Sequence, residues 1–178
     1  MSLSRTLSKL FSKTTSSNQM GLCIGQASVS FSVQNEQNQI NCLDVPLPIN
    51  LSQSLKVEDA TQAVVDMLQQ IEKDQNVSGN CNLILPTSHY QIVQIDKPNV
   101  PDAEISAALK WQVKDQVSIP VDDMIVDYFD GPTLGSSPKL NVVCASKSFL
   151  SSIVHTLDDS DVLLKIISTE EFAFARLL

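Results

Sequence analysis

Apolar residues recur along this chain with two different periods, and the change of period marks the predicted elements. Between residues 101 and 117 they return at every fourth position, which is typical of the buried face of a helix. The members of this stripe are Ile105, Leu109, Val113 and Val117. We expect Pro101 in the first turn, Asn99 as the cap, and an end before Pro120, because the residue preceding a proline is pushed out of helical conformation. Residues 124–129 then alternate as a half-buried strand does.

The same two periods predict the remaining elements. Short apolar or alternating runs indicate strands, and these runs are 20–25, 29–33, 40–47, 82–85, 90–95, 140–145 and 163–167. Residues 57–73 and 149–157 have helical spacing, Ser148 is the expected cap of the second helix, and a last short helix follows from Thr169. Strands and helices in alternation predict an α/β protein.

The order of these elements predicts four regions. Residues 1–19 form a basic, flexible tail, and residues 20–87 hold three strands, a helix and a fourth strand. Residues 88–168 have the order β-α-β-β-α-β, which we expect to make one compact sheet with two helices on one face. Residues 169–178 form the remaining piece.

The composition is that of a soluble globular protein, with 43% hydrophobic and 18% charged residues. No apolar run approaches the roughly 18 residues that would span a bilayer. The net charge of −8 disfavours general nucleic-acid binding, which depends on basic patches.

The charge is unevenly distributed, because the opening segment carries +3 and the rest of the chain −11. Its basic residues are Arg5, Lys9 and Lys13, and its apolar residues Leu3, Leu7, Leu10 and Phe11 have helical spacing. A basic amphipathic helix on an anionic membrane surface, formed by residues 1–17, is one interpretation. A disordered Ser/Thr-rich tail is the other, and the predominance of small polar residues favours it. The segment also resembles a mitochondrial presequence in composition.

Residue types that often carry chemistry are scattered here. The four cysteines Cys23, Cys42, Cys81 and Cys144 lie in separate strand-like runs without a CxxC pair, so we expect buried, reduced thiols and no zinc site. His89 and His155 have no motif partners, and we expect both to be exposed polar residues. The acids at 122–123 and 158–161 lack the spacing of a calcium loop and are expected to be solvated loop charges. The sequence thus predicts neither a catalytic nor a metal site.

A family resemblance lies in ALKWQVKDQVSIPVDDMIVDYFD, which resembles a segment of PilM-like proteins, the actin-like assembly components of type IV pili. The matching residues are Ala108, Leu109, Trp111, Ile119, Pro120, Asp127 and Tyr128, whereas Gln112 stands where Glu is usual. The similarity is greatest to members that serve the mannose-sensitive haemagglutinin (MSHA) pilus. It implies an actin-like (ribonuclease H-like) first subdomain with an inserted small subdomain, to which residues 169–178 return. It covers residues 21–178 and the first half of the family's usual length.

The resemblance also identifies GLCIGQASVS as a degenerate phosphate turn, made of Gly25, Gln26, Ala27 and Ser28. The family pattern G-x-D-I-G-x-x-S-V-K has an acid that holds Mg²⁺, and here Cys23 replaces it while Ser30 replaces the lysine. A largely protonated thiol is a poor ligand for magnesium. We therefore expect no cofactor and no ATP hydrolysis, with binding of ATP and Mg²⁺ as the alternative; an intact turn for folding alone is the simplest interpretation.

The resemblance implies a non-enzymatic cytoplasmic scaffold, peripheral to the inner membrane, that acts with other pilus assembly components. Its partner would be the N-terminal cytoplasmic tail of a bitopic, PilN-like inner-membrane protein, bound in a groove between the two subdomains. Tyr90, Ile92 and Trp111 are candidate contact residues. Trp111 lies about 200° from Leu109 around the helix, off the apolar stripe. We expect it to pack against a neighbouring subdomain of the same chain, and an exposed position that awaits a partner is the alternative. An actin-like ATPase switch, or a fragment of a longer protein, are the alternatives.

Overall fold

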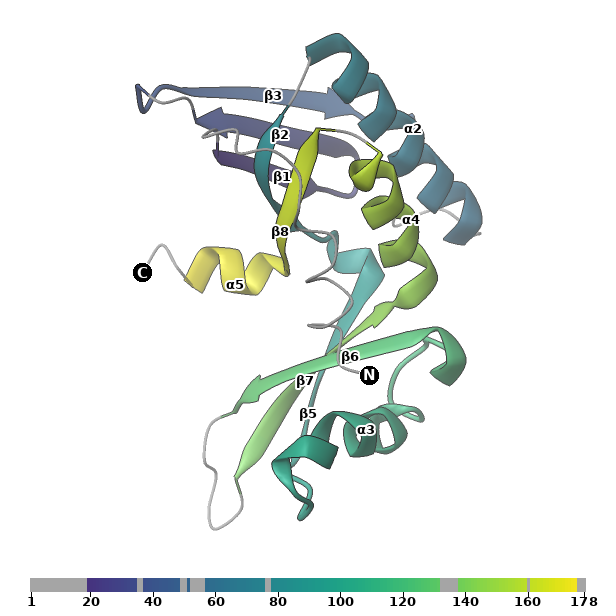
Figure 1. Cartoon of the computed structure of the whole chain (residues 1–178). Coiled ribbons are helices and arrows are strands. Elements are labelled where there is room, and N and C mark those ends of the chain that lie inside the picture. Colours follow the sequence, from purple (N-terminus) through teal and green to yellow (C-terminus); the bar gives the residue numbers. More distant parts are fainter. Residues whose placement is uncertain are drawn as a thin grey trace. The chain divides into compact units, whose positions relative to one another are not determined.

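The computed structural model describes residues 19–34, 37–48, 51, 57–75, 78–131, 138–159 and 161–175 (Figure 1). The predicted basic tail, with its possible membrane helix, therefore lies outside the described residues apart from Gln19. The chain forms two compact units, which we call unit 1 (residues 1–87 and 151–178) and unit 2 (residues 88–150). Unit 2 is thus inserted into the chain of unit 1.

Unit 1 is built on a five-stranded sheet with the order β3-β2-β1-β4-β8. Its strands are β1 (Gln19–Ile24), β2 (Ser28–Gln34), β3 (Ile40–Pro46), β4 (Gly79–Ile84) and β8 (Val162–Ser168). The first three pair antiparallel through short connections, and β1, β4 and β8 run parallel. Alternate residues of β1, β2 and β4 are buried, for example Leu22, Val29 and Leu83, so one face of the sheet holds the core.

Two helices cover the buried face of this sheet. They are α2 (Val57–Gln75) and α4 (Lys147–Asp158). Val64, Met67, Leu68 and Ile71 on α2 are buried, as the apolar stripe predicted. Figure 1 shows α2 and α4 on the same side, whereas α5 (Glu170–Ala175) starts where β8 ends and lies apart from them. The boundary between the units falls inside α4, after Leu150.

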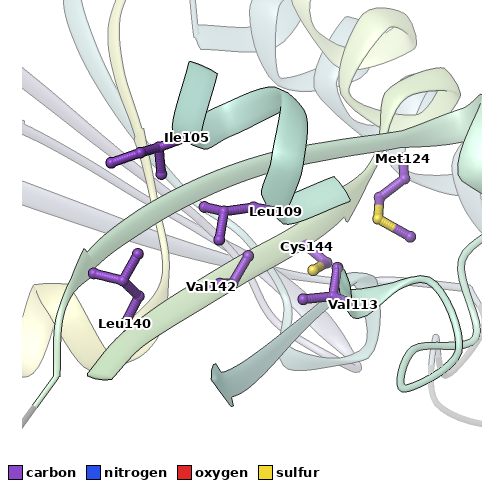
Figure 2. Packing of buried hydrophobic residues seen from close by; sticks show 7 residues of the cluster. All are labelled: Ile105, Leu109, Val113, Met124, Leu140, Val142 and Cys144. Carbon is purple, nitrogen blue, oxygen red and sulfur yellow. The ribbon is translucent and has the colours of Figure 1, made fainter. Parts of the chain in front are cut away.

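Unit 2 is an antiparallel three-stranded sheet with one helix packed on it. The strands are β5 (Tyr90–Asp96), β6 (Met124–Asp130) and β7 (Lys139–Ser146) in the order β5-β7-β6, and the helix is α3 (Asp102–Val113). Short 3-10 turns, η1 (Thr87–His89) and η2 (Val121–Asp123), precede β5 and β6. Figure 2 shows the core between α3 and the sheet, formed by Ile105, Leu109, Val113, Met124, Leu140, Val142 and Cys144.

The predicted stripe of α3 is confirmed, but the predicted ends of this helix are wrong. It ends at Val113, well before Pro120, because the Gln116 N–H donates to the Val113 carbonyl (2.8 Å) and closes a tight turn. The Gln91 side chain then accepts from the Ser118 backbone N–H (2.8 Å) and holds the following segment. Val117 consequently reaches the core from a loop. At the other end Pro101 is the N-cap, without a side-chain hydrogen bond from Asn99 or any other residue.

The predicted second region, residues 88–168, is wrong at its C-terminal end. The order β-α-β-β-α-β is confirmed, but unit 2 ends at residue 150, and β8 pairs in parallel with β4 in unit 1. The pairing of Gly79–Ile84 with Val162–Ser168 joins residues on either side of the inserted unit, and sequence order alone does not reveal such a pairing. Although β8 follows unit 2 in the sequence, it belongs to the sheet of unit 1.

Candidate functional site

The turn Gly25–Ser28 joins β1 to β2, and its backbone groups are used in folding. The Gly25 N–H donates to the Ser28 carbonyl (2.8 Å). The Gln26 and Ala27 carbonyls accept from the N–H groups of Leu51 (2.7 Å) and Leu47 (2.8 Å). A Cβ on Gly25 would lie 3.1 Å from the Ser28 carbonyl oxygen, which explains the glycine without a ligand. The Gln26 amide also donates to the Thr87 hydroxyl (3.1 Å) in the loop after β4.

A row of side chains crosses the sheet beside this turn, on the face opposite to the core. The strand registers align Asp44, Ser30, Cys23, Ile84 and Ser168 in one row, and Cys42, Ser32, Gly21, Asn82 and Ile166 in the next. We call these two rows the open face of unit 1. Apart from the isoleucines and cysteines, its residues are small or polar.

The environment of the turn is anionic. The Ser30 hydroxyl donates to an Asp44 carboxylate oxygen (2.6 Å), and this bond together with one from Ser28 holds the pKa of Asp44 below its usual value. Burial raises the pKa of the Cys23 thiol, and the negative charges of Glu170 and Asp44 raise it further. Among the described side chains of unit 1, Lys165 is the sole lysine or arginine. A nucleotide phosphate would meet carboxylates here instead of the cations that usually hold it.

The three predicted contact residues have different surroundings. Tyr90 is 6% exposed, so its ring belongs to the fold. Ile92 is 37% exposed and Trp111 is 63% exposed. Packing of Trp111 against the other unit therefore stays a prediction, as does contact with a partner. The Lys114 ammonium lies 5.7 Å from the centre of the Trp111 ring, within range of a cation–π contact.

Ile92 lies on the face of the unit 2 sheet that α3 leaves open. Val93 and Ile95 contact the core beneath α3, so Ile92 and Gln94 point to the opposite side. There Ile92 pairs across the strands with Val143, and the Gln94 amide donates to Asn141 (3.1 Å). β5 is an edge strand of this sheet, so among the described residues it pairs with a strand on one side alone.

A second cluster was not predicted from the sequence. The Asp123 carboxylate accepts from the Ser146 hydroxyl (2.7 Å), the Ser148 N–H (2.8 Å) and the Ser148 hydroxyl (3.1 Å). The Ser146 hydroxyl in turn accepts from the Phe149 N–H (3.2 Å), so Ser146 caps α4 and the prediction of Ser148 is wrong. Although burial opposes it, these hydrogen bonds hold the pKa of Asp123 below its usual value. Asp123 is therefore a capping residue and not a solvated loop charge.

His89 also departs from its prediction. Its ring stacks on Phe149 with 4.0 Å between ring centres, and burial lowers its pKa to about 4. His155 is exposed as expected, with Nδ1 4.0 Å from an Asp159 oxygen.

The cysteines differ among themselves. Burial raises the pKa of Cys81 to about 12 and that of Cys144 to about 11, which fits inert thiols. Cys42 is exposed and Cys23 half-buried, contrary to the expectation of four buried thiols.

The described residues include no group of three or more His, Cys, Asp or Glu side chains placed to hold a metal ion. None of the described helices is long and apolar enough to cross a membrane.

No protein-family model matches the sequence, and no curated protein matches it. Solved structures do match. The cytoplasmic domain of EpsL, an inner-membrane component of the type II secretion system of Vibrio cholerae, aligns with 85% of this chain and 57% of its own, at 14% identity and a TM-score of 0.57. The PilM-PilN type IV pilus biogenesis complex aligns with 87% of this chain and 48% of its own, at 16% identity and a TM-score of 0.63. A Bacteroides thetaiotaomicron protein with an actin-like ATPase fold and unknown function aligns with 90% of this chain and 55% of its own, at 10% identity and a TM-score of 0.53.

These likenesses show that the chain has an actin-like fold, as the resemblance implied. Unit 1 supplies its five-stranded sheet, with unit 2 inserted between β4 and β8. The chain spans about half the length of each of these structures.

Proposed function

We propose that this protein is a non-enzymatic scaffold of a type IV pilus or related secretion machine, of the MSHA type. It would act in the cytoplasm beside the inner membrane and bind the N-terminal cytoplasmic tail of a bitopic, PilN-like protein. The observation that carries the proposal is the likeness in fold, over most of this chain, to a PilM-PilN pilus complex and to the cytoplasmic domain of EpsL.

The chemistry at the turn supports a role without nucleotide hydrolysis. Cys23 stands where the family acid would hold Mg²⁺, and its thiol is kept protonated by burial and by Glu170 and Asp44. The Gly25 N–H is already bonded to Ser28, so it is not available to a phosphate. The alternative is a nucleotide-dependent switch. It would have to bind Mg²⁺ and phosphate without the acid and without the Gly25 N–H.

The open side of the unit 2 sheet suits an extended tail. Edge strand β5 offers backbone groups for strand addition, and Ile92 with Val143 offers an apolar contact beside the polar Gln94–Asn141 pair. Main-chain hydrogen bonds could thus provide the affinity for an extended peptide. One side-chain contact would fix the register in which the peptide pairs with β5.

Isothermal titration calorimetry with a synthetic tail of the cognate bitopic protein tests the proposal. We expect saturable binding that Ile92→Ser weakens about tenfold, as loss of one apolar contact does. Ile40→Ser is the matched control, because Ile40 is an exposed isoleucine at 63% on edge strand β3 of unit 1. A tail that does not bind the wild-type chain contradicts the proposed partner.

Titration of the same protein with Mg-ATP separates the scaffold from the switch. We expect no binding by the wild-type chain. Micromolar binding by the wild type would favour the switch, and Cys23→Asp should then strengthen it by restoring a magnesium ligand.

A further inference from the structure

Helix α3 carries a second stripe of side chains, on the side opposite to the one that packs on the sheet of unit 2. Figure 2 shows the buried side directed toward the sheet. At 100° per residue, the second stripe falls within an arc of about 80° on the other side. Its members are all exposed: Glu104, Ala107, Trp111 and Lys114. We call them the outer stripe. Trp111 is 63% exposed, and a large aromatic side chain in such a position is typical of a binding surface.

The order of these residues makes the outer stripe complementary to a second copy of itself. When two identical helices pack antiparallel about a two-fold axis, facing residues lie equally far from the axis along the two chains. With the axis beside position 109, Trp111 faces Ala107 of the second copy, two positions away on either side. The same register places Glu104 opposite Lys114 of the second copy, five positions away on either side. We propose that this protein associates into a symmetric dimer through the outer stripe of α3.

Each contact in this register joins groups that suit one another. Trp111 is large and Ala107 is small, so the ring of one copy fits over the methyl group of the other while the helix axes stay about 8–10 Å apart. The Lys114 ammonium lies 5.7 Å from the centre of the Trp111 ring in its own chain, so it is placed beside this contact. Lys114 continues the helical conformation of α3 with φ −52° and ψ −33°, which keeps it in line with the stripe. Symmetry forms each pair twice, and burial of the two Trp111 rings supplies most of the affinity.

The size of the stripe predicts a weak, reversible dimer. Helix α3 has 12 residues and is thus about 18 Å long. A pair of such helices buries less than the roughly 1,200 Å² at which stable interfaces begin. Each copy has a net charge of −8, so the two copies repel over long range. This repulsion is screened at an ionic strength of about 0.15 M, whereas charges in contact still interact. The inference does not rest on the proposed function, because it uses α3 and not the edge of β5.

Sedimentation velocity of the full chain tests the proposal over roughly 5–500 µM, a range suited to a weak interface. We expect a reversible monomer–dimer equilibrium for the wild type. Trp111→Ala should weaken the dimer about tenfold or more, as loss of a central aromatic contact does. Gln112→Ala is the matched control, since Gln112 is exposed on α3 but lies about 100° from Trp111 around the helix. It should leave the equilibrium unchanged.

Charge reversal separates a dimer from any contact within one chain. Glu104→Lys and Lys114→Glu each place like charges opposite one another in the dimer, and each should weaken it about tenfold. An equimolar mixture of the two variants should restore association, because a chain of one kind and a chain of the other regain both attractions. Lys110→Glu changes the net charge as Lys114→Glu does, but Lys110 lies on the flank of the outer stripe. This control should keep the wild-type equilibrium, and circular dichroism verifies that every variant is folded.

Two outcomes would overturn the proposal. One is a wild-type chain that stays monomeric over the whole concentration range. Protection of Trp111 fluorescence from acrylamide in that monomer would then assign the ring to a contact within the chain. The other is a dimer that both charge reversals leave intact, or that their mixture does not restore after each has weakened it. Such a dimer would use another surface.

Discussion

Within the described part of the chain, the two sheets each bury one face, and their other faces differ in chemistry. The open face of unit 1 is lined by serines, asparagine and the Asp44 carboxylate beside a protonated thiol. The open side of unit 2 instead carries Ile92 with Val143, a Gln94–Asn141 hydrogen bond, and a Lys139–Asp96 ion pair of 2.6 Å. The first face is polar and anionic, whereas the second combines an apolar cross-strand pair with a hydrogen-bonded pair of amides. Two sheets of one chain that each bury one face thus present different chemistry on the other.

Replacement of one core leucine in each unit should give the largest loss of stability. It tests whether the two units have separate cores that unfold independently. Leu109 and Leu83 are both 0% exposed, the first in unit 2 and the second in unit 1. Each change to Ala should lower the free energy of unfolding by about 2–5 kcal/mol, through lost burial and the cavity that remains. Hydrogen exchange should show that Leu109→Ala reduces amide protection in β5 and β7 much more than in β1 and β2.

Gln112→Ala, at an exposed position of the same helix, is the control for Leu109→Ala. Equal loss of protection in both sheets after Leu109→Ala would mean that the two units unfold as one.

Acid should destabilise unit 2 through His89. Its folded-state pKa of about 4 lies below the ordinary value of 6.5, so the unfolded chain takes up the proton first as pH falls. The stabilisation is complete above pH 6.5 and is lost progressively toward pH 4. Because the ring is partly exposed, we expect a loss of about 1–2 kcal/mol. Denaturant unfolding at pH 7 and pH 4.5 measures it.

His89→Phe should remove this part of the pH dependence while keeping the stack on Phe149. His155→Phe changes an exposed histidine and should retain it. An unchanged pH dependence in His89→Phe would contradict the assignment.

Loss of the cap at α4 should have the smallest of these effects. Asp123→Ala removes the acceptor for Ser146 and the Ser148 N–H, and we expect a cost of about 1 kcal/mol, as for other helix caps. Asp122→Ala changes the adjacent acid and is the control. Thermal unfolding of the two variants measures the difference, and equal midpoints would show that the Asp123 contacts do not stabilise α4.

Periodicity predicted the elements of this fold well because each buries a regular apolar stripe. The stripe Ile105, Leu109 and Val113 is the centre of the unit 2 core. The end of α3 could not be predicted, since a hydrogen bond from Ser118 to Gln91, 27 residues away, shapes the segment that follows. The place of β8 was missed for a similar reason, because the pairing that positions it joins residues from opposite ends of the inserted unit.

The candidate site was less predictable than the fold. Cys23 marked the unusual turn from sequence alone, but its acidic neighbours Asp44 and Glu170 come from other strands and helices. The Asp123 cap had a weak signal in the Ser146-Lys147-Ser148 run, which offers two hydroxyls at the start of a helix. Whether Tyr90 is buried and Trp111 exposed depends on contacts with residues distant in the sequence. The periodicity of one helix or one strand does not predict such contacts.

The insertion of unit 2 between β4 and β8 also shapes how the chain can fold as it emerges from the ribosome. β4 cannot gain its second neighbour until Val162–Ser168 has been synthesised, so the sheet of unit 1 must wait with an unpaired edge. Closing so long a loop from a disordered chain is slow and costs conformational entropy. Unit 2 has its own core and sequence-local pairing between β6 and β7, so it can form during this wait. Once unit 2 has folded, residues 88 and 150 are held at fixed positions. The loop that must close before β8 can pair with β4 is then effectively shorter, and its closure costs less conformational entropy.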